Sequence, residues 1–152
     1  MLMGGGVILL LAGLFAWPIV TDKTRAWVKE WKAAGLECLN GHQNASQHIH
    51  QTVTINVDDK PETLVGDLGY VRSCMAEIHI HKGQDNYLHV ESVSADKKFK
   101  LGQFFAVYRK PLEREGYTLE AKVNGEAYTG NIADLILADK QVIELNYKKT
   151  GN

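Results

Sequence analysis

The chain has little excess charge and none of the common signatures of a nucleotide or cofactor site. Its 152 residues include 17 lysines and arginines, interleaved with 18 aspartates and glutamates, for a net charge of −1. Without a basic stripe for a phosphate backbone, nucleic acid is a poor candidate partner. No nucleophile and base pair, phosphate loop or cofactor fingerprint stands out, so we predict no catalytic or cofactor-binding residue and rank enzyme activity last.

Cysteine is scarce as well. The chain has only Cys38 and Cys74, and neither belongs to a Cys-x-x-Cys motif. Two lone cysteines that flank a compact unit predict one disulfide in an oxidising compartment, worth roughly 3 to 4 kcal/mol in the chain-entropy model. Two buried free thiols are the alternative. A thiolate at Cys74 assisted by His79 is a weaker one, because nothing marks this cysteine as activated.

Charged residues are missing from the first twenty positions. This run has about the length that a helix needs to cross the hydrocarbon core of a lipid bilayer. A positively charged start and an Ala-x-Ala site are both missing, so we prefer an uncleaved anchor to a signal peptide. The predicted organisation is a transmembrane anchor at 1–20, a helical stalk at 21–39 and a β-rich histidine-cluster domain at 40–152.

The stalk carries two tryptophans, Trp27 and Trp31, four residues apart and therefore on one helix face. That face can rest on the membrane surface or a membrane protein partner, or pack against this protein's own domain. Nearby basic residues would place this end of the anchor in the cytoplasm under the positive-inside rule, so charge alone does not settle the orientation. They are Lys23, Arg25, Lys29 and Lys32.

The histidines of the chain follow an unusual pattern. Five of the six histidines fall in three short stretches, 48–50, 79–81 and 89–91, where they alternate with apolar residues. Successive side chains of a strand point to opposite faces, so the polar residues of each stretch share one face. If the strands are neighbours, these faces merge into one patch. The candidate metal ligands are His48, His50, His79, His81, His89 and Glu91.

Metal binding is the chemistry that this pattern favours. Two imidazoles of a His-x-His strand lie about 6 to 7 Å apart at Cα, so their rings can converge on one ion. Neutral imidazole with a carboxylate suits copper or zinc. The preferred subset is His79, His81 and His89, joined by His48 and His50 if the first strand adjoins. Glu91 is either a ligand or a hydrogen-bond partner of one.

A hydrogen-bonded histidine network without metal is the competing interpretation. The sixth histidine, His42, lies outside the alternation, and we expect it to be an exposed loop residue.

Strands predominate in the rest of the chain. Alternation predicts a strand at 47–57, with a turn at 58–61 and a return strand at 63–65. Strands at 77–82 and 87–92, joined by the polar link 83–86, predict a second hairpin that sets His79 and His81 opposite His89 and Glu91. Further strands are predicted at 117–123, 126–128 and 141–147, with an Asn124-Gly125 hairpin turn.

One helix is predicted at 101–109, where Leu101, Phe104, Phe105 and Tyr108 recur at helical spacing before Pro111. The predicted fold class is α+β: an N-terminal transmembrane helix and helical stalk, then a compact, mostly antiparallel β domain with one helix. An immunoglobulin-like sandwich is the alternative, because the sequence leaves the strand order open.

The order of these motifs resembles a family of uncharacterised prokaryotic proteins, in which a membrane anchor precedes HIHPHL, CxxxLHTHD, IHIES and TLGxFF blocks. The resemblance runs from about Cys38 to Tyr147. Two positions depart from it: Thr52 replaces the third histidine of the first block, and Lys82 replaces the aspartate of the second. Family members look like exported proteins, which implies an extracytoplasmic domain. The matching stretches are 38, 48–50, 74–75, 79–81, 89–92 and 101–105.

Two functions of different classes follow from the sequence. The first is a membrane-tethered extracytoplasmic metal-binding module that handles copper or zinc. The second is an accessory or assembly subunit of a larger membrane complex, docked through Trp27 and Trp31, in which the histidines serve structure.

Overall fold

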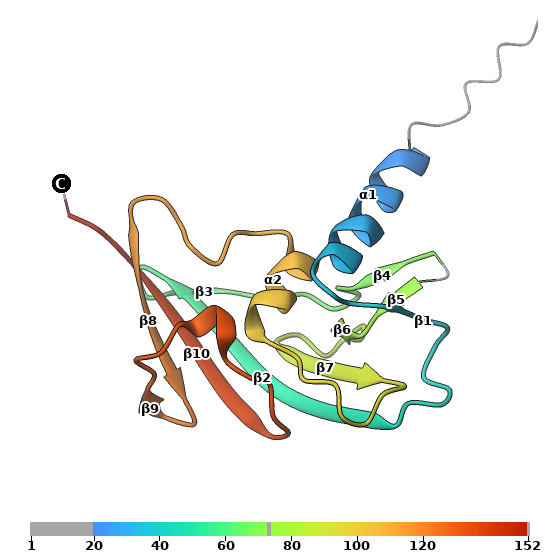
Figure 1. Cartoon of the computed structure of the whole chain (residues 1–152). Helices are drawn as coiled ribbons and strands as arrows, with labels where there is room; N and C mark the ends of the chain where they lie inside the picture. The colour runs from blue at the N-terminus through green and yellow to red at the C-terminus, as the bar shows by residue number, and fades with distance from the viewer. Residues whose placement is uncertain (1–19, 73, 152) are drawn as a thin grey trace, which may run out of the picture.

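The computed structural model describes residues 20–72 and 74–151, and strands predominate there (Figure 1). The helical elements are α1 (Val20–Ala33), α2 (Leu101–Tyr108) and the 3-10 turn η1 (Ile132–Asp134). The strands are β1 (Cys38–Leu39), β2 (Gln47–Val57), β3 (Lys60–Glu62), β4 (Tyr70–Val71), β5 (Cys74–Ala76), β6 (Ile78–His79), β7 (Tyr87–Ser92), β8 (Tyr117–Val123), β9 (Glu126–Ala127) and β10 (Gln141–Lys149).

A seven-stranded sheet forms the body of the molecule. Its strands lie in the order β6-β7-β2-β10-β8-β9, and β3 pairs with β2 in addition. The two long strands β2 and β10 run side by side through its middle and are parallel, whereas the other pairs are antiparallel (Figure 1). The sheet is therefore mixed.

The core lies between one face of this sheet and α2. Val53 and Ile55 of β2 are fully buried there, as the alternation predicted, and α2 contributes Leu101, Phe104 and Phe105. Arg109 ends α2 in the left-handed conformation. Because apolar residues of β2 occupy the core side, His48 and His50 lie on the opposite face.

A second, three-stranded sheet in the order β1-β5-β4 lies beside β6. The predicted disulfide is confirmed: Cys38 of β1 is bonded to Cys74 of β5, with their Cα atoms 5.0 Å apart. The bond closes a separation of 36 residues. It fixes the start of the loop that follows β1 and the start of the segment that leads into β6.

The predicted fold class is wrong. The described chain is mainly β, with a mixed sheet, a small antiparallel sheet and only two short α-helices. Alternation has the same period in parallel and antiparallel strands. It therefore could not reveal that the last strand, β10, lies between β2 and β8.

The helix at the predicted stalk ends earlier than expected. Gly35, with φ of +82°, closes α1, and the Leu36 N–H donates to the Trp31 carbonyl at 2.9 Å. Trp31 is buried in the core and the Arg109 guanidinium lies 3.8 Å from the Trp27 ring centroid. These tryptophans thus pack against this protein's own domain, while a partner at the stalk stays a prediction.

The predicted single-pass membrane localisation is corrected. Within residues 20–72 and 74–151, no helix combines the length and apolar character needed to cross a bilayer. The anchor predicted at 1–20 lies outside the described residues except for its last position.

Two predicted hairpins are present, one with a shifted boundary. Asn124 and Gly125 both have positive φ and join β8 to β9, as expected for this dipeptide. The return strand after β2 is β3, at Lys60–Glu62 rather than 63–65, because Asp58 and Asp59 adopt positive φ and turn the chain at once. Pro61 is tolerated there because β3 is short and pairs only with β2.

Candidate metal centre

Strand pairing brings the three histidine stretches together. β7 lies between β2 and β6, with His89 directly opposite both His50 and His79. His48 lies opposite Glu91 one step further along the same face. The predicted hairpin and the adjoining first strand are both present, so the condition for a merged patch is met.

The second stretch leaves the sheet sooner than predicted. β6 ends at His79, and His81 follows beyond it, hydrogen-bonded through Nδ1 to the Tyr70 hydroxyl at 2.8 Å. The His81 ring stays close to the sheet, with its centroid 4.1 Å from that of His89. Lys82, which departs from the family pattern, is exposed.

The close approach of β4 to β6 depends on a glycine. Gly69 has φ of +88°, and a Cβ there would lie 2.8 Å from the His79 Cβ. No other residue fits this position without displacing His79. The chain can therefore pass directly over the buried histidine and place Tyr70 beside His81.

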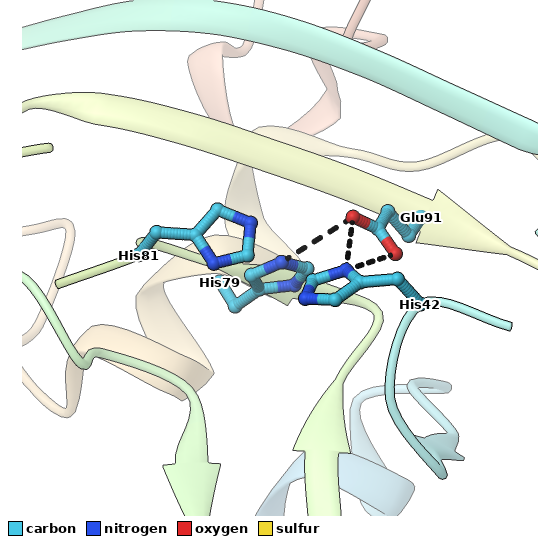
Figure 2. Close-up of side chains that lie close together, drawn as sticks. All are labelled: His42, His79, His81 and Glu91. Carbon is cyan, nitrogen blue, oxygen red and sulfur yellow. Dashed lines mark hydrogen bonds and ion pairs between the residues drawn. The ribbon is translucent and has the colours of Figure 1, made fainter.

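His42 is the site residue that the sequence interpretation missed. It lies in the loop after β1 and is exposed over 53% of its side chain, yet its Nδ1 is 2.8 and 2.9 Å from the two oxygens of Glu91 (Figure 2). No alternation marks it. The available signal was its distance in sequence from Cys38, four residues upstream, since the disulfide ties this loop to the segment that carries His79.

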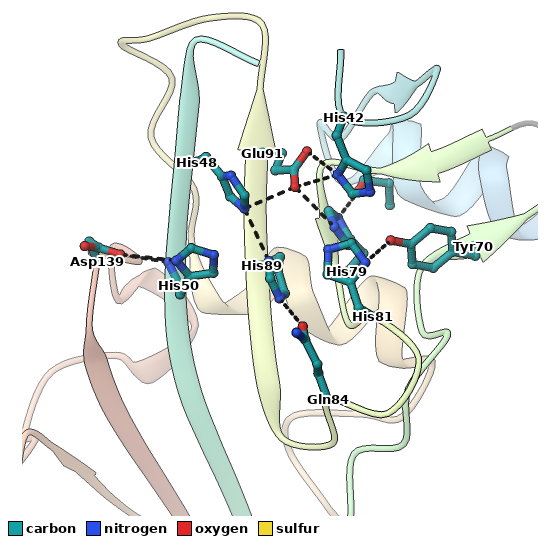
Figure 3. Close-up of polar contacts among 11 residues, drawn as sticks. His42, His48, His50, Tyr70, His79, His81, Gln84, His89, Glu91 and Asp139 are labelled. Atoms are coloured by element: carbon teal, nitrogen blue, oxygen red, sulfur yellow. Dashed lines mark hydrogen bonds and ion pairs between the residues drawn. The ribbon is translucent and has the colours of Figure 1, made fainter. Parts of the chain in front are cut away.

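The side chains form two groups that adjoin on one face of the sheet (Figure 3). Within each group, one ligand atom from every residue lies within 4.8 Å of the others. The buried group is His42, His79, His81 and Glu91, and the outer group is His48, His50 and His89. All the ligands predicted from sequence are brought together here, and His42 is added.

Four of the rings are oriented by a hydrogen-bond or ion-pair partner on one nitrogen. His79 Nδ1 donates to the Ala76 carbonyl at 2.9 Å, and His89 Nε2 donates to Gln84 Oε1 at 2.6 Å. His50 Nδ1 faces Asp139 Oδ1 at 3.7 Å, and the partner of His81 is Tyr70. The two acceptor oxygens fix the tautomers of His79 and His89 and aim their other ring nitrogens, an arrangement typical of metal-binding histidines.

Burial favours the neutral form of three of the rings, those of His79, His81 and His89. It lowers the pKa of His79 to about 3, although the hydrogen bond to the Ala76 carbonyl opposes this shift. Burial also lowers the pKa of His89 to about 3, and the charges of the neighbouring histidines, His81 first, act in the same direction. The pKa of His81 is lowered for the same main reason. Neutral imidazole is the form that binds metal ions.

Glu91 and His79 face each other in the interior. Both side chains are fully buried, and His79 Nε2 lies 3.7 Å from Glu91 Oε1. Because Nδ1 carries the His79 proton, Nε2 presents a lone pair, and it has no hydrogen-bond partner in the described part of the chain. No lysine or arginine among the described residues forms an ion pair with Glu91, which instead faces the rings of His42, His48 and His79.

A second buried carboxylate, Glu77, lies between β5 and β6 and belongs to neither group. It accepts hydrogen bonds from the Ser92 hydroxyl at 2.8 Å and from the Glu37 N–H at 2.9 Å, and it forms an ion pair with Lys97. The charge of Glu77 is therefore paired, whereas that of Glu91 meets only imidazole. Glu91 lies on β7 and Glu77 just before the paired strand β6, so two carboxylates on neighbouring segments differ in how their charges are paired.

A pocket of about 410 Å³ opens beside the loop that carries His42. His42 and Tyr70 line it together with apolar side chains and Arg72. Of the four residues of the buried group, His42 is the one that lines this pocket.

Comparisons with protein-family models, with curated proteins and with solved structures found no match to this chain.

Proposed function

We propose that this protein binds a divalent transition-metal ion through the buried group His42, His79, His81 and Glu91. The observation that carries the proposal is the pair of opposed lone pairs at His79 Nε2 and Glu91 Oε1, 3.7 Å apart and both buried. Two such acceptors repel each other in a low-dielectric interior. A cation between them replaces that repulsion with attraction to both atoms.

The donor set favours copper or zinc. Three imidazoles and one carboxylate are ligands that Cu(II) and Zn(II) accept, whereas Mg(II) and Ca(II) prefer oxygen. Both cysteines are in the disulfide, so no thiolate competes for the ion or selects Cu(I). Disulfides persist in oxidising compartments, and we place this metal-binding protein in one.

Removal of the carboxylate charge tests the proposal. Glu91→Gln keeps the shape of the side chain but removes its charge, and we expect the affinity for Cu(II) and Zn(II) to fall roughly 100-fold or more, since one of four ligands is weakened. Glu144→Gln is the matched control, because Glu144 lies on the same face of the sheet in β10. The measurement is competitive titration against a chelator near neutral pH.

Two results would reject this function. One is a wild-type protein that binds neither Cu(II) nor Zn(II) above background, which would favour the hydrogen-bonded network. The other is an equal loss of affinity in Glu91→Gln and Glu144→Gln, which would show a diffuse charge effect rather than a site.

A further inference from the structure

We infer that the outer group, His48, His50 and His89, is a second metal position, and that Glu91 is shared between the two ions of one centre. The inference rests on the proposed binding of the first ion by the buried group. It adds that the outer ion is bound more weakly and keeps a coordination position open to solvent.

The outer ligands come from two paired strands. His50 and His89 are directly opposite in the β2 and β7 register, and His48 follows two residues from His50 on the same face. The His48 and His50 ring centroids are 4.5 Å apart, and those of His50 and His89 are 4.6 Å apart. Strands with a fixed register position such ligands more rigidly than a loop does.

The tautomers suit a metal ion. Gln84 Oε1 accepts a hydrogen bond from the protonated His89 Nε2, so His89 Nδ1 presents a lone pair. This lone pair faces His48 Nε2 at 3.3 Å. A shift of the His48 proton from Nε2 to Nδ1 turns this hydrogen-bonded pair into two lone pairs aimed at one point. His50, with Asp139 beside its Nδ1, supplies the third nitrogen.

Glu91 touches both groups. Its Oε1 lies 2.8 Å from His42 Nδ1 in the buried group and 3.2 Å from His48 Nε2 in the outer group. A carboxylate has two oxygens and lone pairs enough to serve two ions. Ions that share a ligand in this way lie about 3.5 to 4 Å apart in known two-metal sites.

Charge and exposure set the order of binding. The first ion neutralises Glu91, so the second meets a positive neighbour, offset only in part by Asp139 near His50. In the outer group His48 and His50 are 47% and 29% exposed and only His89 is buried, whereas in the buried group His79 and Glu91 are fully buried and His42 is the exposed member. Three imidazoles, two of them open to solvent, leave room for water or a small ligand, as in catalytic metal sites.

The test is metal stoichiometry with Cu(II) in the full chain. We expect two ions per chain, the second at least tenfold weaker, and an electron paramagnetic resonance spectrum with spin coupling between adjacent Cu(II) ions. His48→Ala/His50→Ala is expected to retain the first ion and lose the second, together with the coupling. Thr52→Ala, the next residue on that face of β2, is the control and should keep both ions.

The other outcomes separate the proposed function, binding of the first ion, from the inferred two-ion centre. One ion in the wild type, unaffected by His48→Ala/His50→Ala, overturns the second position and leaves the first. Two ions without spin coupling overturn the shared carboxylate. A single ion that is lost in His48→Ala/His50→Ala but not in Glu91→Gln overturns both the proposed function and the two-ion centre. Circular dichroism of each variant confirms that the exposed substitutions leave the fold intact.

Discussion

The polar face of the large sheet has two halves built on the same alternation but with different chemistry. On β6, β7 and β2 it carries four of the histidines and Glu91, whereas on β10 and β8 it carries side chains such as Glu144, Asn146 and Lys122. In the second half, Glu144 lies opposite Lys122, and the Asn56 amide donates to Asn146 Oδ1 at 2.9 Å. Polar residues there are satisfied by one another and by solvent.

The two halves share the alternation but differ in the segments that cover them. The loop that carries His42 and the small sheet that carries Tyr70 lie against the histidine half, so Glu91 is buried on a strand with both faces shielded. Glu144 is partly exposed and has a lysine opposite. The two halves thus differ in that the histidine half combines a buried carboxylate, unpaired with any lysine or arginine of the described residues, with rings held by hydrogen bonds to neighbouring groups.

Among the changes that test this comparison, loss of the disulfide is expected to have the largest effect on stability and metal affinity. Cys38→Ser/Cys74→Ser should lower the free energy of unfolding by roughly 3 to 4 kcal/mol, because it frees a loop of 36 residues in the unfolded chain. It should also weaken metal binding, since the loop with His42 begins at Cys38. Denaturant titration and metal titration measure the two effects. Unchanged affinity in the folded variant would show that His42 needs no such anchor.

The next effect is a loss of stability in the metal-free protein between about pH 6.5 and 4.5, to which the histidine half contributes most. An unfolded histidine has a pKa near 6.5, whereas that of buried His79 is about 3, so the unfolded chain binds more protons between these values. Stability of the metal-free protein should therefore fall as pH decreases from about 6.5 towards 3, and be unaffected by this group above that window. At pH 4.5 the cost from His79 is about 2 to 3 kcal/mol.

Denaturant titration of the metal-free protein at several pH values checks this slope. His79→Gln is expected to reduce the slope between pH 6.5 and 4.5 without abolishing it, because the pKa of His89 is also lowered to about 3, whatever the effect of the substitution on stability at neutral pH. An equally steep slope in His79→Gln would assign the pH dependence to other groups and remove the contrast between the halves.

The smallest effect is expected when histidines are placed on the other half. Thr54 and Glu144 are neighbours across the parallel pair of β2 and β10. Thr54→His/Glu144→His adds two adjacent imidazoles without a buried carboxylate or orienting partners, so the stoichiometry of tightly bound Zn(II) should equal that of the wild type. A further tight ion, measured by equilibrium dialysis, would mean that paired imidazoles suffice.

Local patterns predicted the parts of the site that depend on strand periodicity. The faces of β2 and β7, the second hairpin and the disulfide follow from alternation, a polar link of hairpin length and two lone cysteines. The parallel neighbour β10 and the loop contact of His42 depend on tertiary packing, which leaves no periodic signal. Directly after β6, the Ile80 N–H donates to the Leu68 carbonyl at 2.9 Å, a tertiary contact that the sequence also does not show.

The most direct test of the central claim is anomalous diffraction at the zinc edge from crystals of the Zn(II)-loaded protein. We expect a peak within coordination distance, about 2 Å, of His79 Nε2 and of a Glu91 oxygen. His79 Nδ1 should still donate to the Ala76 carbonyl. A protein that takes up no zinc, or a zinc peak with His79 Nε2 and Glu91 outside its coordination sphere, would contradict the account.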